Sequence, residues 1–268
     1  MERSLGLICG AGVLPARMAA AARRQGWRVV AFTVGEVPGV VSHADLVVPS
    51  RLNEAGAVLA VLQRERVSAV LFSGKFWMQD FLRGERPDAT LADMTDRAGA
   101  MIDTKLLDVV IATLGQLGIT LLDQRPFIDD WLSGAGCWSA RQPTDAEWQD
   151  VRRGLEIARL AADARIGQTV VVRRGAATAV EAVEGTTDAM RRGMALGGPG
   201  AVIVKAVARG HDYRFDTPTV GPETLEAAAA GGATVVAVEA GRVHILERDA
   251  TVRLADAAGI ALVSVSAG

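Results

Sequence analysis

Residues 211–221 (HDYRFDTPTVG) form the most unusual polar stretch of this 268-residue chain. They follow an apolar run that contains Lys205 and precede a helix that we expect to begin at Pro222. Asp216 offers a carboxylate and Arg214 a permanent positive charge. Loops placed in this way often hold binding or catalytic groups. The stretch predicts phosphate or metal chemistry at Asp216, and the structural alternative is that Asp216 is a turn residue.

A second polar group, EGTTD at residues 184–188, lies where a β-rich run ends and a helix is expected to begin. Glu184 and Asp188 are hard oxygen ligands, and Thr186 and Thr187 add hydroxyl groups. Because Mg²⁺ usually keeps several waters, one or two carboxylates are enough to bind it. The group therefore predicts a metal or phosphate site, while helix capping by one of these side chains is the alternative.

Residues 10–15 (GAGVLP) form a glycine-rich turn between the first expected strand and helix. Such a turn presents backbone N–H groups at a helix N-terminus, which favours an anion. A dinucleotide fingerprint would need a third glycine where Pro15 stands and an acid where Thr33 stands. Gly10 and Gly12 therefore predict a phosphate contact of another kind, or a turn needed only for packing.

Lys75 follows another expected strand in the sequence SGK. This position is at the carboxyl end of the predicted sheet, where open α/β folds bind their ligands. Lys75 is therefore a candidate phosphate contact, and an exposed loop lysine is the alternative.

The overall composition excludes several classes of protein. Half of the residues are hydrophobic, 22% are charged, and the net charge is −2. This composition is typical of a globular protein and gives no electrostatic reason to expect a nucleic-acid partner. Two cysteines make no disulfide framework, and no apolar run reaches the length of a membrane span. We expect a cytoplasmic protein.

The elements expected around these residues alternate between strands and helices in the first half. Strands are expected at 5–9, 28–33, 68–72 and 119–122, and helices at 15–25, 54–66 and 103–118. This order predicts an open, Rossmann-like parallel sheet with crossover helices.

The second half predicts a mixed α/β (α+β) domain. Strands are expected at 168–173, 176–183, 201–207, 234–238, 242–246 and 260–265, and helices at 144–162, 185–196, 222–230 and 248–258. The strand at 242–246 is expected to pair with the strand at 234–238. We expect an N-terminal domain at 1–130, a linker at 131–143 and a C-terminal catalytic domain at 144–268.

Three blocks make the chain recognisable: GLICGAGVLP, IGQTVVVRRGAATAVEAVEGTTDAMRRG and VIVKAVARGHDYRFDTPTVGPETLEAAAAGGATVVAVEAGRVHIL. In their order and spacing they resemble the LpxI-type UDP-2,3-diacylglucosamine pyrophosphatases of lipid A biosynthesis. The resemblance implies hydrolysis of this UDP-sugar to UMP and 2,3-diacylglucosamine 1-phosphate, with attack on the β-phosphorus. It also implies Mg²⁺ or another divalent cation and a ligand site in a cleft between two domains.

The resemblance implies roles for particular residues as well. The essential aspartate of the family maps onto Asp216, which we expect to be catalytic and to bind the metal together with Asp188 and Glu184. The expected substrate-binding residues are Gly10, Gly12, Leu14, Lys75, Thr186, Thr187, Lys205, Arg214 and Thr219. The acyl chains of the substrate predict transient contact with the inner face of the cytoplasmic membrane, and a homo-oligomer is compatible with the sequence.

Two departures from the family pattern keep an alternative open. EGTTD holds one more threonine than the usual EGTD, and Asp103-Thr104 stands where the family often has two acids. A non-catalytic nucleotide-sugar binding or regulatory protein of the same fold is therefore the competing hypothesis. The acyl chains also predict an exposed apolar strip that includes Trp131, Leu132 and Trp138.

Overall fold

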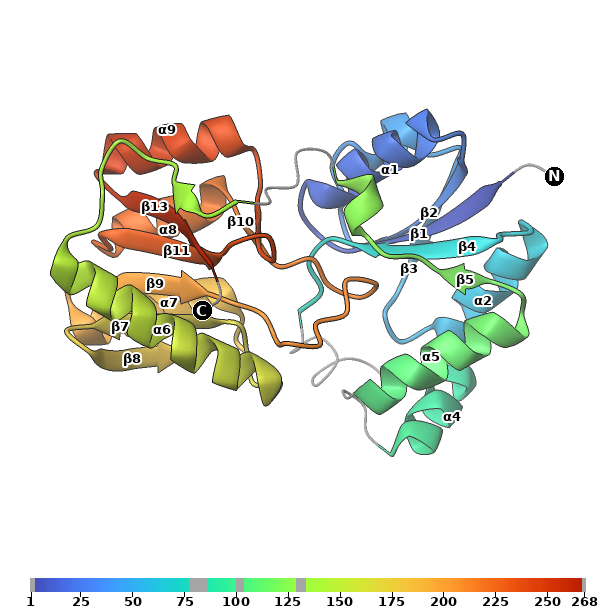
Figure 1. The fold of residues 1–268 in the computed structure, drawn as a ribbon. Helices are drawn as coiled ribbons and strands as arrows, with labels where there is room; N and C mark the ends of the chain where they lie inside the picture. Colours follow the sequence, from blue (N-terminus) through green and yellow to red (C-terminus); the bar gives the residue numbers. More distant parts are fainter. Residues whose placement is uncertain (1–2, 78–85, 100–103, 129–133, 267–268) are drawn as a thin grey trace. The chain divides into compact units, whose positions relative to one another are not determined.

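The computed structural model describes residues 3–77, 86–99, 104–128 and 134–266, and the chain divides into two compact units. Unit 1 comprises Met1–Asp129 and Asp212–Thr217, and unit 2 comprises Asp130–His211 and Pro218–Gly268. Each unit is a layered α/β structure around its own sheet, as Figure 1 shows. The predicted fold class, a parallel N-terminal sheet followed by a mixed C-terminal sheet, is confirmed.

Unit 1 is built on a five-stranded, fully parallel sheet in the order β3-β2-β1-β4-β5. Its strands are β1 (Ser4–Cys9), β2 (Arg28–Val34), β3 (Leu46–Ser50), β4 (Ala69–Ser73) and β5 (Thr120–Leu121). Its helices are α1 (Leu14–Arg24), α2 (Ala55–Arg64), α4 (Ala89–Ala98) and α5 (Thr104–Gln116), with short 3-10 turns η1 (Val40–His43) and η2 (Arg125–Phe127). Helix α1 covers one face of the sheet, and α2 and α5 cover the other (Figure 1).

The strand order places a topological switch point between β1 and β4. The chain moves outward from β1 to β2 and β3 on one side, and then from β4 to β5 on the other. Ligands of open α/β sheets bind at the carboxyl ends of the two strands that flank such a point. Here these ends are Cys9 and Ser73, which are paired neighbours in the sheet.

Two elements of unit 1 were not predicted from the sequence. Strand β3 contains Pro49, which reads as a strand breaker, but β3 lies at the edge of the sheet, where a missing N–H is tolerated. Helix α4 is only ten residues long, and Asp88 caps it by accepting a hydrogen bond from Leu91 N at 2.8 Å. Both elements are short, and short segments are difficult to identify from local patterns alone.

Unit 2 is built on a six-stranded mixed sheet in the order β6-β13-β11-β9-β7-β8. Its strands are β6 (Gly136–Cys137), β7 (Thr169–Arg173), β8 (Ala176–Val180), β9 (Val202–Lys205), β11 (Val235–Glu239) and β13 (Ala261–Val265). A separate parallel pair joins β10 (Thr219–Val220) to β12 (His244–Ile245), and the helices are α6 (Asp145–Asp163), α7 (Thr186–Gly197), α8 (Pro222–Ala230) and α9 (Arg248–Ala258).

Alternating side chains of the unit 2 strands fill two separate cores. Val202 and Val204 face the core that α6 covers, whereas Ile203 faces the core that α7, α8 and α9 cover. Strand residues point to opposite faces in turn, so a run such as AVIV at residues 201–204 is apolar throughout when both faces are covered. Unit 2 is therefore a helix–sheet–helix sandwich, with the loops at the strand ends available for function.

The predicted pairing of residues 242–246 with the strand at 234–238 is wrong. Strand β11 already has β9 on one edge and β13 on the other, so no edge remains for a third partner. The residues form β12 instead, which pairs in parallel with β10. The pairing ties the end of the 211–221 stretch to the body of unit 2.

Part of the segment predicted as a linker has regular structure. Strand β6 pairs antiparallel with β13 at the edge of the unit 2 sheet. Residues 129–133 lie outside the described residues. Among the described helices, none has the length and apolar character needed to cross a bilayer.

Candidate active site

Two glycine turns meet at the switch point of unit 1. Gly10 N donates to Ser73 O at 2.8 Å, Ala11 N donates to Lys75 O at 3.0 Å, and Lys75 N donates to Ala11 O at 2.8 Å. A Cβ on Gly10 would lie 2.5 Å from Lys75 O, and one on Gly74 would lie 2.7 Å from Ala11 O. The two turns therefore form one structure. Their backbones approach too closely for a side chain at Gly10 or Gly74.

The N-terminus of α1 opens directly from this paired turn. No side chain among the described residues caps it, and its first turn contains no acid. Gly12 has φ +97° and open space around a Cβ position. The first N–H groups of a helix carry partial positive charge and attract anions. The geometry therefore suits a phosphate group.

The Ser73 side chain adds a second observation at the same place. Ser73 is 1% exposed, and its Oγ has no hydrogen-bond partner within the described part of the chain. A buried hydroxyl without a partner is costly, and its occurrence in a native fold calls for an explanation. A bound anion beside the paired turn would supply that missing partner.

Two other predicted residues of unit 1 lie at or near the turn. The ammonium of exposed Lys75 lies 5.2 Å from the centre of the Trp77 ring, in a cation–π contact. The Leu14 side chain is buried at the start of α1, so only its backbone is available to a ligand.

Residues Asp212–Thr217 leave unit 2 and pack on unit 1. Tyr213 O accepts a hydrogen bond from Gln124 N at 3.0 Å, and the Phe215 ring lies 5.7 Å from that of Phe72 in β4. Buried Thr217 donates from Oγ1 to Gln124 Oε1 at 2.6 Å. The segment therefore lies at the carboxyl edge of the unit 1 sheet, where β4 and β5 end.

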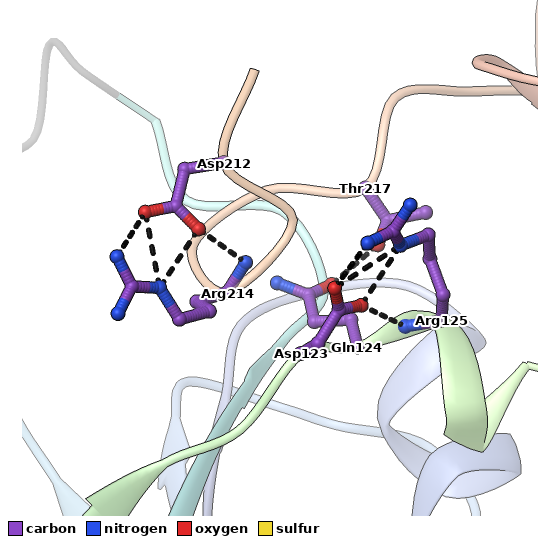
Figure 2. Close-up of polar contacts among 6 residues, drawn as sticks. All are labelled: Asp123, Gln124, Arg125, Asp212, Arg214 and Thr217. Atoms are coloured by element: carbon purple, nitrogen blue, oxygen red, sulfur yellow. Dashed lines mark hydrogen bonds and ion pairs between the residues drawn. The ribbon is translucent and has the colours of Figure 1, made fainter. Parts of the chain in front are cut away.

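Two arginine–carboxylate pairs lie on either side of this contact, as Figure 2 shows. Arg214 binds Asp212 in a fork, with Nε 3.0 Å from Oδ1 and Nη2 2.7 Å from Oδ2. Arg125 binds Asp123 in the same way and stacks on the Tyr213 ring at 4.3 Å. Both guanidinium groups are charged at any working pH.

The charges of the two pairs affect each other. The hydrogen bond from Arg125 is the main reason that the pKa of Asp123 is lowered, and the nearby charge of Asp212 works against the shift. The hydrogen bond to Asp212 is the main reason that the pKa of Arg214 is raised, with help from the charges of Asp108 and Asp123. Two guanidinium groups and two carboxylates therefore lie close together at this edge of unit 1.

Asp216 itself is exposed on unit 1. Its two chain neighbours, Phe215 and Thr217, are the residues that hold the segment against Phe72 and Gln124. The carboxylate is therefore presented on a segment that is anchored on both sides of it. That is the arrangement expected of a group that must reach a ligand from a fixed position.

Unit 2 contains a second group of predicted residues, at the start of α7. Lys205, 9% exposed, donates from Nζ to Thr186 Oγ1 at 3.1 Å, and Thr186 Oγ1 donates to Glu181 Oε1 at 2.8 Å. Thr187 is half-buried in the same turn, and Thr219 is half-buried in β10. The structure thus connects Thr186, rather than Thr187, to the buried lysine.

The structure does not gather the predicted metal ligands of unit 2. Partial burial acts to raise the pKa of Glu184, but the hydrogen bond and charge of Arg192, together with backbone hydrogen bonds, outweigh it and the pKa is lowered. Asp188 is exposed and pairs with Arg191 at 3.1 Å. Over residues 3–77, 86–99, 104–128 and 134–266, no three His, Cys, Asp or Glu side chains are grouped to hold a metal ion.

The fit to a divalent cation is therefore limited to single carboxylates. Glu184 and Asp188 each pair with an arginine. Asp216 is exposed, and its carboxylate offers hard oxygen ligands. Mg²⁺ commonly uses one or two protein carboxylates and completes its shell with waters and substrate phosphates. Asp216 fits such a site, and Asp103 lies outside the described residues.

Two residues of this arrangement were missed by sequence reasoning. Glu181 contacts Thr186, although the sequence pointed to Glu184 three positions later. Gln124 contacts two residues of the Asp212–Thr217 segment, from almost ninety positions away. A second acid in the EAVEGTTD string was a signal for Glu181, whereas no local signal marks Gln124.

The predicted apolar strip is only partly described. Trp131 and Leu132 lie outside the described residues. Trp138 packs against the core of unit 2 and donates from Nε1 to Ser264 Oγ at 2.7 Å. Trp138 is partly buried against this core, and its place in an exposed apolar strip stays a prediction.

The fold defines a two-unit α/β protein, and the switch point of its parallel sheet is a candidate anion site. Residues 4–131 match the LpxI N-terminal domain family, and residues 134–263 match the LpxI C-terminal domain family. The chain belongs to the LpxI family.

A curated relative and two solved structures complete the comparison. The relative is UDP-2,3-diacylglucosamine pyrophosphatase LpxI of Caulobacter vibrioides, 29% identical over 284 residues that cover 98% of each chain. Among solved structures, a glycinamide-RNase-transformylase T from Mycobacterium tuberculosis is 17% identical, with a TM-score of 0.28, over 63% of this chain and 38% of that one. An ADP complex of the N5-carboxyaminoimidazole ribonucleotide synthetase purK is 11% identical, with the same TM-score, over 65% and 38%. At these TM-scores neither likeness bears on fold or function.

Proposed function

We propose that the protein hydrolyses the pyrophosphate of UDP-2,3-diacylglucosamine to UMP and 2,3-diacylglucosamine 1-phosphate, a step of lipid A synthesis, with the help of Mg²⁺ or another divalent cation. Its family and the name of its Caulobacter relative support the substrate. The observation that carries the proposal is the uncapped, acid-free start of α1 beside the unpartnered Ser73 hydroxyl. This is a site for the phosphate of a nucleotide.

The chemistry requires charge neutralisation before anything else. A phosphoanhydride resists water because its anionic oxygens repel the nucleophile. Cations and backbone N–H groups aimed at those oxygens usually supply the largest part of the rate enhancement. In this chain the start of α1 binds one phosphate, and Lys75 and Arg214 supply positive charge on the same unit. A divalent cation, when bound, offsets further charge and acidifies water.

Asp216 is the group that orients the nucleophile. Its carboxylate accepts a hydrogen bond from the attacking water and takes the proton that this water loses, and it would hold the divalent cation. The oxygen of the water forms a bond to the β-phosphorus, the bond from that phosphorus to the bridging oxygen breaks, and UMP leaves with the bridging oxygen. Hydrolysis in H₂¹⁸O would therefore place the label in 2,3-diacylglucosamine 1-phosphate and none in UMP.

The direct test is incubation with UDP-2,3-diacylglucosamine while UMP is followed by chromatography. We expect UMP release in the presence of Mg²⁺ and its loss when EDTA is added. A preparation that binds the substrate but releases no UMP with any divalent cation would overturn the proposal.

One observation favours a second candidate. Glu184 and Asp188, two of the three expected metal ligands, are paired with arginines instead. A binding or regulatory protein of the same fold would retain nucleotide-sugar without metal and without turnover. Calorimetry with UDP-2,3-diacylglucosamine in EDTA, run beside the UMP assay, separates the two functions.

A further inference from the structure

Three hydrogen-bonded attachments, in addition to the ring contact of Phe215 on Phe72, bear on the segment that presents Asp216. On the unit 2 side, Val207 N donates to Glu239 Oε2 at 2.9 Å before the segment, and His244 N donates to Pro218 O at 2.8 Å after it. These two contacts hold the chain where it leaves and re-enters unit 2. They lie outside Asp212–Thr217 and do not fix the conformation of Asp216.

The third attachment is Gln124, on unit 1. Gln124 follows β5 and is 2% exposed. Its backbone N donates to Tyr213 O at 3.0 Å, and its Oε1 accepts from Thr217 Oγ1 at 2.6 Å. One residue therefore binds both ends of the segment, three positions before Asp216 and one position after it. Figure 2 shows Gln124 beside Thr217.

The side-chain contact is the more informative of the two. Thr217 is 6% exposed, so its hydrogen bond to Gln124 is shielded from water. A buried acceptor whose donor is removed finds no water to replace it. Together with the contact of Phe215 on Phe72, the bond fixes the chain on both sides of Asp216 while the carboxylate remains exposed.

We propose that Gln124 is a positioning residue for Asp216, and that it acts through the hydroxyl of Thr217. The inference rests on the proposed function, because it assigns Gln124 a role in the hydrolysis that Asp216 performs. Gln124 touches neither substrate nor metal in this account. It sets the place from which the Asp216 carboxylate meets the water.

Substitutions at Thr217 test the inference because they separate the hydroxyl from the rest of the side chain. Thr217→Val keeps the shape and removes the donor, and Thr217→Ser keeps the donor. A small misplacement of a catalytic group lowers turnover by up to about 100-fold. We expect kcat of Thr217→Val to fall by about 10- to 100-fold with KM changed less than about threefold, and Thr217→Ser to stay within about threefold of wild type. Gln124→Leu should behave as Thr217→Val does.

A matched control removes a buried hydrogen bond elsewhere. Ser264→Ala deletes the acceptor of Trp138 Nε1 in unit 2, a bond of 2.7 Å. We expect a loss of thermal stability similar to that of Thr217→Val, with kcat unchanged. If Thr217→Val and Ser264→Ala affect kcat equally, the role of Thr217 is structural and the inference is wrong.

Hydrogen–deuterium exchange gives a readout that does not depend on activity. Faster exchange across residues 212–217 in Thr217→Val, but not in Thr217→Ser, supports the inference, and unchanged exchange overturns it. Wild-type protein that releases no UMP would show instead that the proposed function fails. Active wild type with full kcat in Thr217→Val would show that only the inference fails.

Discussion

Helices α1 and α7 both begin beside a glycine with positive φ, and the sequence predicts a ligand site at each. The two helix starts are nevertheless chemically different. The start of α1 has no acid in its first turn and lies beside an unpartnered buried hydroxyl. The start of α7 has Asp188 in its first turn, and Thr186 is bonded there to Lys205 and Glu181. The start of α1 has the features that favour an anion, whereas the polar side chains at the start of α7 already bond to one another.

The difference teaches that a glycine turn before a helix is not by itself a phosphate site. The partial positive charge at a helix N-terminus can attract a ligand only where no side chain of the protein already binds there. In unit 1 the two backbone turns bond to each other and leave the helix start open. In unit 2, side chains occupy the turn and its acids bind arginines. The α7 group is therefore better suited to hydrogen-bond a sugar or phosphate oxygen through Lys205 than to bind a metal.

The largest effect is expected where the two turns of unit 1 meet. Gly74→Ala places a Cβ 2.7 Å from the carbonyl oxygens of Gly10 and Ala11, at φ +87°. Backbone cannot move aside cheaply, so we expect a loss of about 3 kcal/mol or more in the free energy of unfolding. The melting temperature should fall by about 10 °C, as measured by calorimetry. Gly115→Ala, a helical glycine with open space around it, is the control and should be neutral or stabilising.

The α7 start is tested by its two adjacent threonines. Thr186→Val removes the hydroxyl that joins Lys205 to Glu181, whereas Thr187→Val leaves that connection intact. We expect Thr186→Val to raise KM for UDP-2,3-diacylglucosamine by about tenfold, the value of one hydrogen bond to a charged group. Equal effects of the two substitutions in the UMP assay would remove the distinction that the structure draws between them.

Substitution of Ser73 is expected to have a smaller effect, and its effect on stability should be opposite in sign to that of most core substitutions. In the unliganded protein Ser73→Ala deletes a buried hydroxyl without a partner, so the melting temperature should be unchanged or slightly higher. With substrate present the same change removes an anion contact, and KM should rise by about three- to tenfold. A fall in stability with unaltered KM would mean that the hydroxyl serves the fold and not the ligand.

The smallest effect concerns acid stability at the Asp123–Arg125 pair. The pKa of Asp123 is lowered in the folded state, mainly by the hydrogen bond from Arg125. Its contribution is therefore present above the unfolded value of about 3.9 and is lost as the pH falls through the lower folded value. The unfolding free energy of wild type should drop more steeply below about pH 4 than that of Asp123→Asn. Denaturation curves at pH 3 and pH 6 measure this difference. An equal loss of unfolding free energy in the two proteins between these pH values would contradict the prediction.

Local patterns predicted most of the elements because the pattern and the packing agree. The Thr144–Glu147 capping box is present as expected, with Thr144 N 2.8 Å from Glu147 Oε2. Strands β7 and β9 follow from apolar runs that are buried on both faces, and β8 follows as the edge partner of β7 in a hairpin. The α7 start was also placed well, although its capping by a threonine or aspartate was not observed among the described residues.

What could not be predicted is non-local. The partner of β12 depends on which strand edges are already occupied. The residue types at 242–246 do not indicate which edges those are. The bond between Gln124 and Thr217 joins positions 93 apart in the sequence. The sequence indicated which residue types were important at Asp216, but only the folded chain shows what holds them in place.

The most direct test of the account compares Asp216→Asn with wild type at saturating UDP-2,3-diacylglucosamine and Mg²⁺. The account predicts that UMP release falls by about 1,000-fold or more while product binding, measured by calorimetry, changes less than about threefold, because the amide fills the same space without accepting the proton or holding the cation. Near wild-type turnover by the folded asparagine variant would contradict it.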